Sequence, residues 1–210
     1  MRLVLPALLL SLLSLSVEAK DFSWRLPHGS RASLSLPSPK VVERYVRRTW
    51  GLEEDEMHVC SAALVDVAKD GYYRLVASVD PSGRDFCNEV IVMRRPDRDL
   101  HTQTFSVWQV EDIAEALVDL DHDGIPELLL PQSLSAYQGA ETCGTWTRIY
   151  RWKDDNYVNA SDAFPDFYEA RYHLLKSTLE NAEHPECLTK EMDKIEEFLK
   201  AQDNEVPAAN

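Results

Sequence analysis

The stretch that most constrains the fold is residues 119–127, which read Asp-Leu-Asp-His-Asp-Gly-Ile-Pro-Glu. Carboxylates occupy the first, third, fifth and ninth positions, and Gly124 occupies the sixth. The flanking segments, 116–118 and 128–130, are short apolar runs of the kind that form buried strands, and Pro131 is expected to end the second run. The sequence therefore predicts a strand–loop–strand unit at this point.

The spacing of these acidic residues is typical of a calcium loop. Ca²⁺ takes about six to eight oxygen ligands at roughly 2.3–2.6 Å, and alternate carboxylates supply them. Gly124 permits the sharp turn that folds the later ligands back onto the ion. Pro126 biases the residue before it towards an extended conformation, which fixes the direction of that residue's carbonyl. The predicted metal ligands are Asp119, Asp121, Asp123, the carbonyl of Ile125, and Glu127.

Two other interpretations of this loop have weaker support. An EF-hand would carry its closing Glu at the twelfth position, which is Leu130 here. A plain Asp/Gly turn without an ion is the other alternative, because Asp and Gly are ordinary turn residues. The carboxylates of residues 119–127 would repel one another in such a turn, so the pattern favours the metal.

The loop resembles the DxDxDGxxD/E calcium loops of FG-GAP and VCBS-type repeats, which form the blades of integrin-like β-propellers. The resemblance covers only residues 119–127, a small part of the chain. It implies a local blade-like fold and a bound Ca²⁺, and it implies no activity. Together with the leader described below, it points to a secreted bacterial protein.

An internal repeat extends this pattern. Residues 63–71 align without gaps on residues 116–124, sharing an Ala-Leu-Val-Asp start and an Asp-Gly close. We therefore expect two degenerate blade-like units, near 57–95 and 103–160, although two β-hairpins can also resemble each other by chance. A complete propeller needs about four blades or more, so two units cannot close one.

The first copy of the loop lacks the ligand set of the second. Ala68 stands where Asp121 stands, and Arg74 stands where Glu127 stands. Alanine offers no oxygen, and arginine brings a positive charge where a carboxylate is needed. The first copy should hold its turn without metal, with Arg74 pairing Asp66 or Asp70.

The predicted fold class is α+β, with antiparallel blade-like sheet units, an N-terminal helix and a C-terminal helical hairpin. Two amphipathic helices, beginning at Pro165 and after the break at 183–185, form the hairpin, which should pack on the sheet or on the N-terminal helix. The single domain should span 39–203. The other expected elements are a helix near 41–50 and strands at 59–67, 72–79, 86–93, 103–111, 146–152 and from 157.

The N-terminal 19 residues are typical of a cleaved signal peptide. Arg2 precedes an apolar run over 3–15, and a small-residue cleavage site follows at 17–19. Residues 20–38 are expected to form a flexible leader, and 204–210 a frayed tail. The apolar run of the leader is too short to span a bilayer comfortably, and no later segment is long and apolar enough to span one. We therefore expect a secreted or periplasmic protein without membrane insertion.

An even number of cysteines in an exported chain predicts two disulfides. Three pairings of Cys60, Cys87, Cys143 and Cys187 are possible. We prefer Cys143–Cys187, which would attach the helical hairpin to the sheet, and this leaves Cys60–Cys87. In a regular meander the latter two would lie about 9–10 Å apart across an intervening strand, so their pairing requires a bend or a bulge.

Composition limits the functional classes. A formal net charge of −14 argues against nucleic acid and anionic membranes as partners. The sequence contains no Gly-rich phosphate loop, GxSxG or HExxH motif, and its six histidines are scattered. We expect a monomeric, exported calcium-binding protein with a structural or binding role and a protein or glycan partner, rather than an enzyme. The alternative is a secreted hydrolase or enzyme inhibitor in which calcium is only structural.

Overall fold

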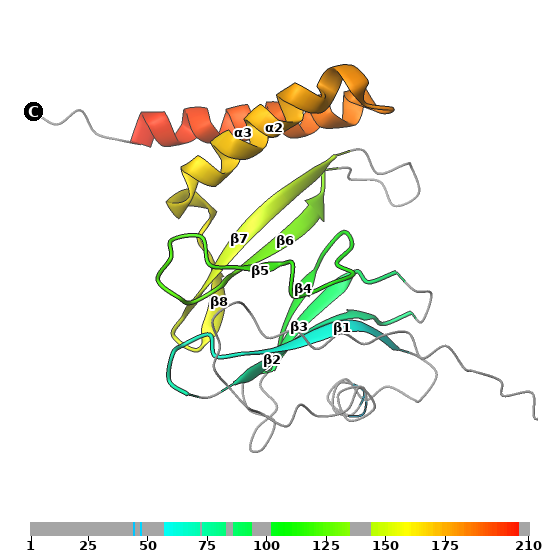
Figure 1. Cartoon of the computed structure of the whole chain (residues 1–210), viewed down its shortest axis with the longest axis vertical. Helices are drawn as coiled ribbons and strands as arrows, with labels where there is room; N and C mark the ends of the chain where they lie inside the picture. Colours follow the sequence, from blue (N-terminus) through cyan, green and yellow to red (C-terminus); the bar gives the residue numbers. More distant parts are fainter. Residues whose placement is uncertain are drawn as a thin grey trace, which may run out of the picture.

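The structure is a computed structural model, and it describes residues 57–71, 73–82, 86–93, 102–134 and 144–205, with Arg44 and Arg47. Two four-stranded antiparallel sheets run in the orders β1-β2-β3-β4 and β5-β6-β7-β8 (Figure 1). This agrees with the predicted α+β class with blade-like sheets. The strands are β1 His58–Val65, β2 Arg74–Asp80, β3 Glu89–Met93, β4 Thr102–Ser106, β5 Leu117–Val118, β6 Glu127–Ser133, β7 Thr145–Lys153 and β8 Asn156–Asn159.

Three strands of the first sheet are apolar on both faces. β1, β2 and β3 are rich in Val, Ile and Ala, and β2 is buried at every position, whereas β4 is mostly polar. Because side chains alternate between the two faces of a strand, β1, β2 and β3 each contribute to two cores, and β4 contributes Phe105 to one of them. One face packs with apolar residues of β5–β8 in a shared core that includes Val65, Val76, Phe105, Leu128 and Tyr150.

The C-terminal hairpin covers the other side of the second sheet. It consists of α2 Pro165–Thr178 and α3 Pro185–Glu205, with short 3₁₀ turns η1 Ser161–Ala163 and η2 Leu179–Asn181. Figure 1 shows both helices on the side of β5–β8 that faces away from β1–β4. The contact buries Ile149 of β7 with Tyr168 and Leu175 of α2 and Ile195 of α3. The hairpin therefore packs on the sheet, one of the two positions predicted for it.

The predicted end of the strand at Pro131 is wrong. Strand β6 passes through Pro131 and ends at Ser133. Strand β5 pairs with β6 at Glu127 and Leu128 and does not reach Pro131, so among the described strands only β7 pairs with β6 there. An edge of this kind tolerates a residue without an N–H, and the Pro131 carbonyl accepts a 2.8 Å hydrogen bond from the Trp108 N–H.

The predicted frayed tail at the C-terminus agrees only in part with the structure. Helix α3 extends through Glu205, so the first two residues of the predicted frayed tail are helical. Residues 206–210, the predicted signal peptide and the leader lie outside the described residues. So does the predicted N-terminal helix, except for Arg44 and Arg47, which are helical.

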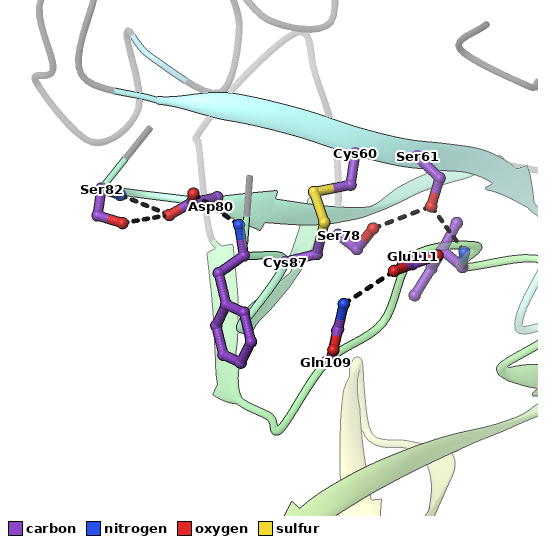
Figure 2. Close-up of a disulfide and its surroundings, with 10 residues drawn as sticks. Cys60, Ser61, Ser78, Asp80, Ser82, Cys87, Gln109 and Glu111 are labelled. Atoms are coloured by element: carbon purple, nitrogen blue, oxygen red, sulfur yellow. Dashed lines mark hydrogen bonds between the residues drawn. A yellow bond between two sulfur atoms is a disulfide. The ribbon is translucent and has the colours of Figure 1, made fainter. Parts of the chain in front are cut away.

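The predicted pairing of Cys60 with Cys87 is confirmed, with a Cα–Cα distance of 6.1 Å (Figure 2). The register of β1 against β2 shifts between Val59 and Ser61, so Cys60 is the extra residue of a β-bulge. Cys87 lies just before β3 begins. The bulge and the position outside β3 therefore bring the two sulfurs together across β2.

Cys187 is also part of a disulfide. Its predicted partner, Cys143, lies outside the described residues. The adjacent residue, Gly144, packs closely on the start of α3, because a Cβ placed there would lie 2.9 Å from the Cys187 carbonyl oxygen. The described chain thus enters β7 directly beside Cys187.

Candidate metal site

Two loops of the molecule match in strand register and in the backbone conformation of two described residues. The first loop, residues 66–74, joins β1 to β2, and the second loop, residues 119–127, joins β5 to β6. The closing strand pairs are Val65 with Arg74 and Val118 with Glu127. The fourth position of each loop has a positive φ, 52° at Lys69 and 60° at His122, and the glycine at the sixth position has 79° and 81° respectively. The two loops therefore match in register and in both left-handed residues.

The second loop brings three predicted ligands together. One oxygen each from Asp119, Asp121 and Glu127 lies within 4.8 Å of the others. Gly124 N–H donates to Asp119 Oδ2, and Leu120 N–H donates to Glu127 Oε2, each at 2.9 Å. These backbone donors fix the carboxylates in a convergent arrangement that could hold a metal ion.

One oxygen of this group is buried without a hydrogen-bond partner in the described part of the chain. It is Asp119 Oδ1. A buried carboxylate oxygen without a donor or a cation carries a desolvation cost. The first position of the loop therefore has the capacity to coordinate a cation.

The structure does not bring Asp123 into this group. Its Oδ1 accepts a 2.7 Å hydrogen bond from the Ile125 N–H, and its side chain is exposed. Its own N–H donates to Asp121 Oδ1 at 3.2 Å. Asp123 thus supports the turn in this geometry, and the coordinating roles of Asp123 and of the Ile125 carbonyl stay predictions.

Arg151 of β7 contacts the same carboxylates, and the sequence analysis missed this residue. Its Nε donates to Glu127 Oε1 at 3.1 Å, and its Nη2 makes a short ion pair with Asp121 Oδ2. The guanidinium carbon lies 4.9 Å from the centre of the Phe164 ring. The alternation of residues along 146–152 was visible in the sequence, but the register that places Arg151 beside the second loop was not.

Glu127 is the most buried of the three carboxylates, with an exposed fraction of 1 %. Burial raises the pKa of its carboxyl group, and the nearby Asp121 carboxylate acts in the same direction. The Leu120 N–H and the Arg151 guanidinium oppose this increase in pKa by stabilising the charged form. Cationic charge at this position therefore favours ionised Glu127.

The first loop contains its own cation. Arg74, which is 3 % exposed, donates to both oxygens of Asp70, at 2.6 and 2.7 Å. Its Nη1 lies 3.8 Å from Asp66 Oδ1, and its guanidinium carbon lies 5.3 Å from the centre of the Trp152 ring. The hydrogen bond to Asp70 raises the pKa of Arg74. The predicted pairing of Arg74 with the aspartates of this loop is confirmed.

The two loops are neighbours in space. A Cβ on Gly124 would lie 2.8 Å from the Lys69 Nζ, so the tip of Lys69 rests on the second loop. Tyr157 of β8 is buried beside both loops, and its hydroxyl donates to the Pro126 carbonyl at 3.4 Å. Burial raises the pKa of Tyr157, and the charge of Glu127 adds to this effect. The carboxylates of the second loop thus lie near two cationic side chains from other segments, Lys69 and Arg151.

Comparisons of this chain with models of protein families, with curated proteins and with solved structures found no match. The likeness of the second loop to FG-GAP loops therefore depends on the sequence of that loop alone. Among the described residues, no helix combines the length and the apolar character that crossing a bilayer requires. What the protein does must accordingly be inferred from the geometry of the second loop.

Proposed function

We propose that this is an exported calcium-binding protein whose second loop holds one Ca²⁺ and whose role is structural or in binding, not catalytic. The proposed ligands are the side chains of Asp119, Asp121, Asp123 and Glu127 and the carbonyl of Ile125. The observation that carries the proposal is the buried, unpartnered Asp119 Oδ1 beside convergent oxygens of Asp121 and Glu127. A cation at this position would offset the desolvation of Asp119 Oδ1.

The chemistry of the donor set favours Ca²⁺ among the common metals. All donors in the group are carboxylate oxygens, which suit hard cations, whereas zinc and copper sites use imidazole or thiolate. Ca²⁺ also tolerates irregular geometry better than Mg²⁺, which demands a near-ideal octahedron. A loop with carboxylates at alternate positions fits the more adaptable ion.

A bound ion would join the ends of β5 and β6 and so stabilise the second sheet. Binding to the folded state alone adds about 2.7 kcal/mol to the free energy of unfolding at a hundredfold excess over Kd. Extracellular calcium modules bind with Kd values of roughly 10⁻⁴–10⁻³ M. The disulfide between Cys60 and Cys87 supports an oxidising, extracytoplasmic location, where such calcium concentrations occur.

The test is thermal unfolding in excess Ca²⁺ and in chelator. Wild-type protein should melt at a higher temperature with Ca²⁺, and Asp121→Ala should abolish the difference. Glu115→Ala, which removes an exposed acid outside both loops, is the matched control and should keep it. Identical melting curves of wild type in Ca²⁺ and in EDTA would refute the metal site.

A further inference from the structure

Arg151 approaches the acidic group in a fixed orientation. Separate nitrogens of its guanidinium contact Glu127 and Asp121, two of the three converging carboxylates. The planar guanidinium suits such two-point contacts better than an ammonium does. On the other side, the guanidinium packs over the ring of Phe164, the residue that precedes α2. Arg151 therefore contacts two of the three carboxylates on which a metal ion would depend.

The positive charge of Arg151 reduces the attraction of the second loop for a metal cation. The affinity of calcium loops depends on the charge of their ligands and on their rigidity. Arg151 offsets one of the negative charges of the second loop, and the Lys69 ammonium lies against Gly124. Like charges within a few ångströms repel strongly where water is partly excluded.

The first loop shows the permanent form of the same arrangement. Arg74 belongs to that loop and is almost completely buried, and it donates to both oxygens of Asp70. Arg151 comes from a different strand, and 36 % of its side chain is exposed. Its long side chain can therefore turn towards solvent while β7 keeps its place.

We infer that Arg151 competes with Ca²⁺ for Asp121 and Glu127, so that the second loop exchanges an internal guanidinium for the metal. The inference rests on the proposed function and concerns the regulation of that same site. Arg151 stabilises the loop when calcium is scarce, and it sets a low affinity that makes binding reversible at extracellular calcium levels. Displacement of Arg151 also changes the contact with Phe164, which connects the metal site to the helical hairpin.

Calorimetric titration with CaCl₂ tests the competition. Arg151→Gln should bind Ca²⁺ about tenfold more tightly than wild type, since the competing charge is gone. Arg148→Gln is the matched control, because Arg148 is an exposed arginine on the same strand and lies outside the acidic group of Asp119, Asp121 and Glu127. Arg148→Gln should leave the affinity within about twofold of wild type, as expected for a screened charge.

The possible outcomes separate the two proposals. If wild type binds Ca²⁺ and Arg151→Gln binds equally or more weakly, Arg151 is a positioning residue, and the competition is refuted while the metal site stands. If neither protein binds Ca²⁺, both proposals are refuted. Should Arg151→Gln fail to fold in chelator, Arg151→Lys decides: it keeps the charge but loses the two-point contact, so an affinity above wild type supports competition and an unchanged or lower affinity refutes it.

Discussion

The first and second loops leave their strands in the same register and turn through the same pair of left-handed residues, yet they compensate their carboxylates differently. In the first loop the compensating cation is Arg74, which belongs to the loop and is buried against Trp152. In the second loop the equivalent position is Glu127, and the cation, Arg151, is recruited from β7. The residue at the ninth position thus separates a loop that contains its own cation from a loop whose cation comes from another strand, and our proposal makes only the latter exchangeable.

The comparison shows how a repeated loop can keep its shape after losing its ligands. Backbone N–H groups of the first loop donate to Asp66, as Gly124 N–H donates to Asp119 in the second. These hydrogen bonds maintain the turn, and Arg74 supplies the positive charge. Each loop therefore has an arginine beside its carboxylates, but the two arginines come from different parts of the chain.

Converting the first loop into the second should have the largest effect. Ala68→Asp with Arg74→Glu would place carboxylates at positions one, three, five and nine, since Asp66 and Asp70 are already present. In chelator the variant should lose about 4–5 kcal/mol of the free energy of unfolding, because a buried cation becomes a buried anion among like charges. Added Ca²⁺ should restore most of that loss.

Calorimetry measures how many Ca²⁺ ions this double variant binds. Wild type should bind one Ca²⁺, and the double variant should bind two. Ala68→Asp alone is the control, and it should still bind one, because Arg74 stays in place. A double variant that binds a single ion would mean that the two loops share a turn but not a potential metal site.

Substituting Arg74 and Arg151 one at a time should distinguish the cation of the first loop from that of the second. Arg74→Gln should cost about 2 kcal/mol in urea unfolding, because the buried Arg74 side chain loses its charged hydrogen bonds to the exposed Asp70. Arg151→Gln should cost about 1 kcal/mol or less in chelator, because Arg151 is partly exposed. Ca²⁺ should compensate for the second substitution only. Equal losses, or rescue of Arg74→Gln by Ca²⁺, would contradict this difference between the loops.

High pH should destabilise the second sheet through Tyr168, which is buried between that sheet and α3. Burial raises the pKa of Tyr168 to about 12. Because the folded pKa exceeds the unfolded one, the protonated tyrosine contributes stability that is complete below about pH 10 and is lost as the pH rises towards 12. Stability should fall by about 2 kcal/mol over this interval, and the fall should be smaller in Tyr168→Phe. Urea unfolding at each pH measures both, and an equal fall in the two proteins would argue against Tyr168.

The glycines of the two loops should give the smallest effect. Gly71→Ala and Gly124→Ala should each cost about 1 kcal/mol, because both positions have a positive φ that alanine rarely adopts. A new Cβ at Gly71 meets nothing, and at Gly124 it meets only the mobile tip of Lys69. Gly124→Ala alone should weaken Ca²⁺ binding. If Gly71→Ala weakens it equally, the loops are energetically coupled and cannot be treated separately.

Local patterns in the sequence were sufficient for much of the fold. Alternating apolar residues placed most strands, and the shared Asp-Gly spacing of the two loops predicted their matching turns. Periodicity and Pro165 placed the helical hairpin. These features depend on residues close together in the chain, which is why one sequence reveals them.

Features that depend on pairing between distant segments could not be predicted in the same way. The contact of Arg151 with Glu127 depends on the register of β6 against β7 and on side-chain orientation. The bulge at Cys60 was recognised only as a requirement of the disulfide, and the passage of β6 through Pro131 depends on how short β5 is. For the site, the sequence identified the carboxylates but not the cation that accompanies them.

Gln103 of β4 forms two hydrogen bonds with the backbone of β8, and these bear on association between molecules. Its side-chain amide donates to the Tyr157 carbonyl at 2.7 Å and accepts from the Tyr157 N–H at 2.8 Å. Tyr157 lies on β8, the last strand of its sheet, where free backbone groups would offer a template for a strand from another chain. Gln103 occupies both groups at once, as a neighbouring strand would. It therefore protects the outer edge of β8 from self-association and leaves the two sheets of one molecule bonded to each other instead.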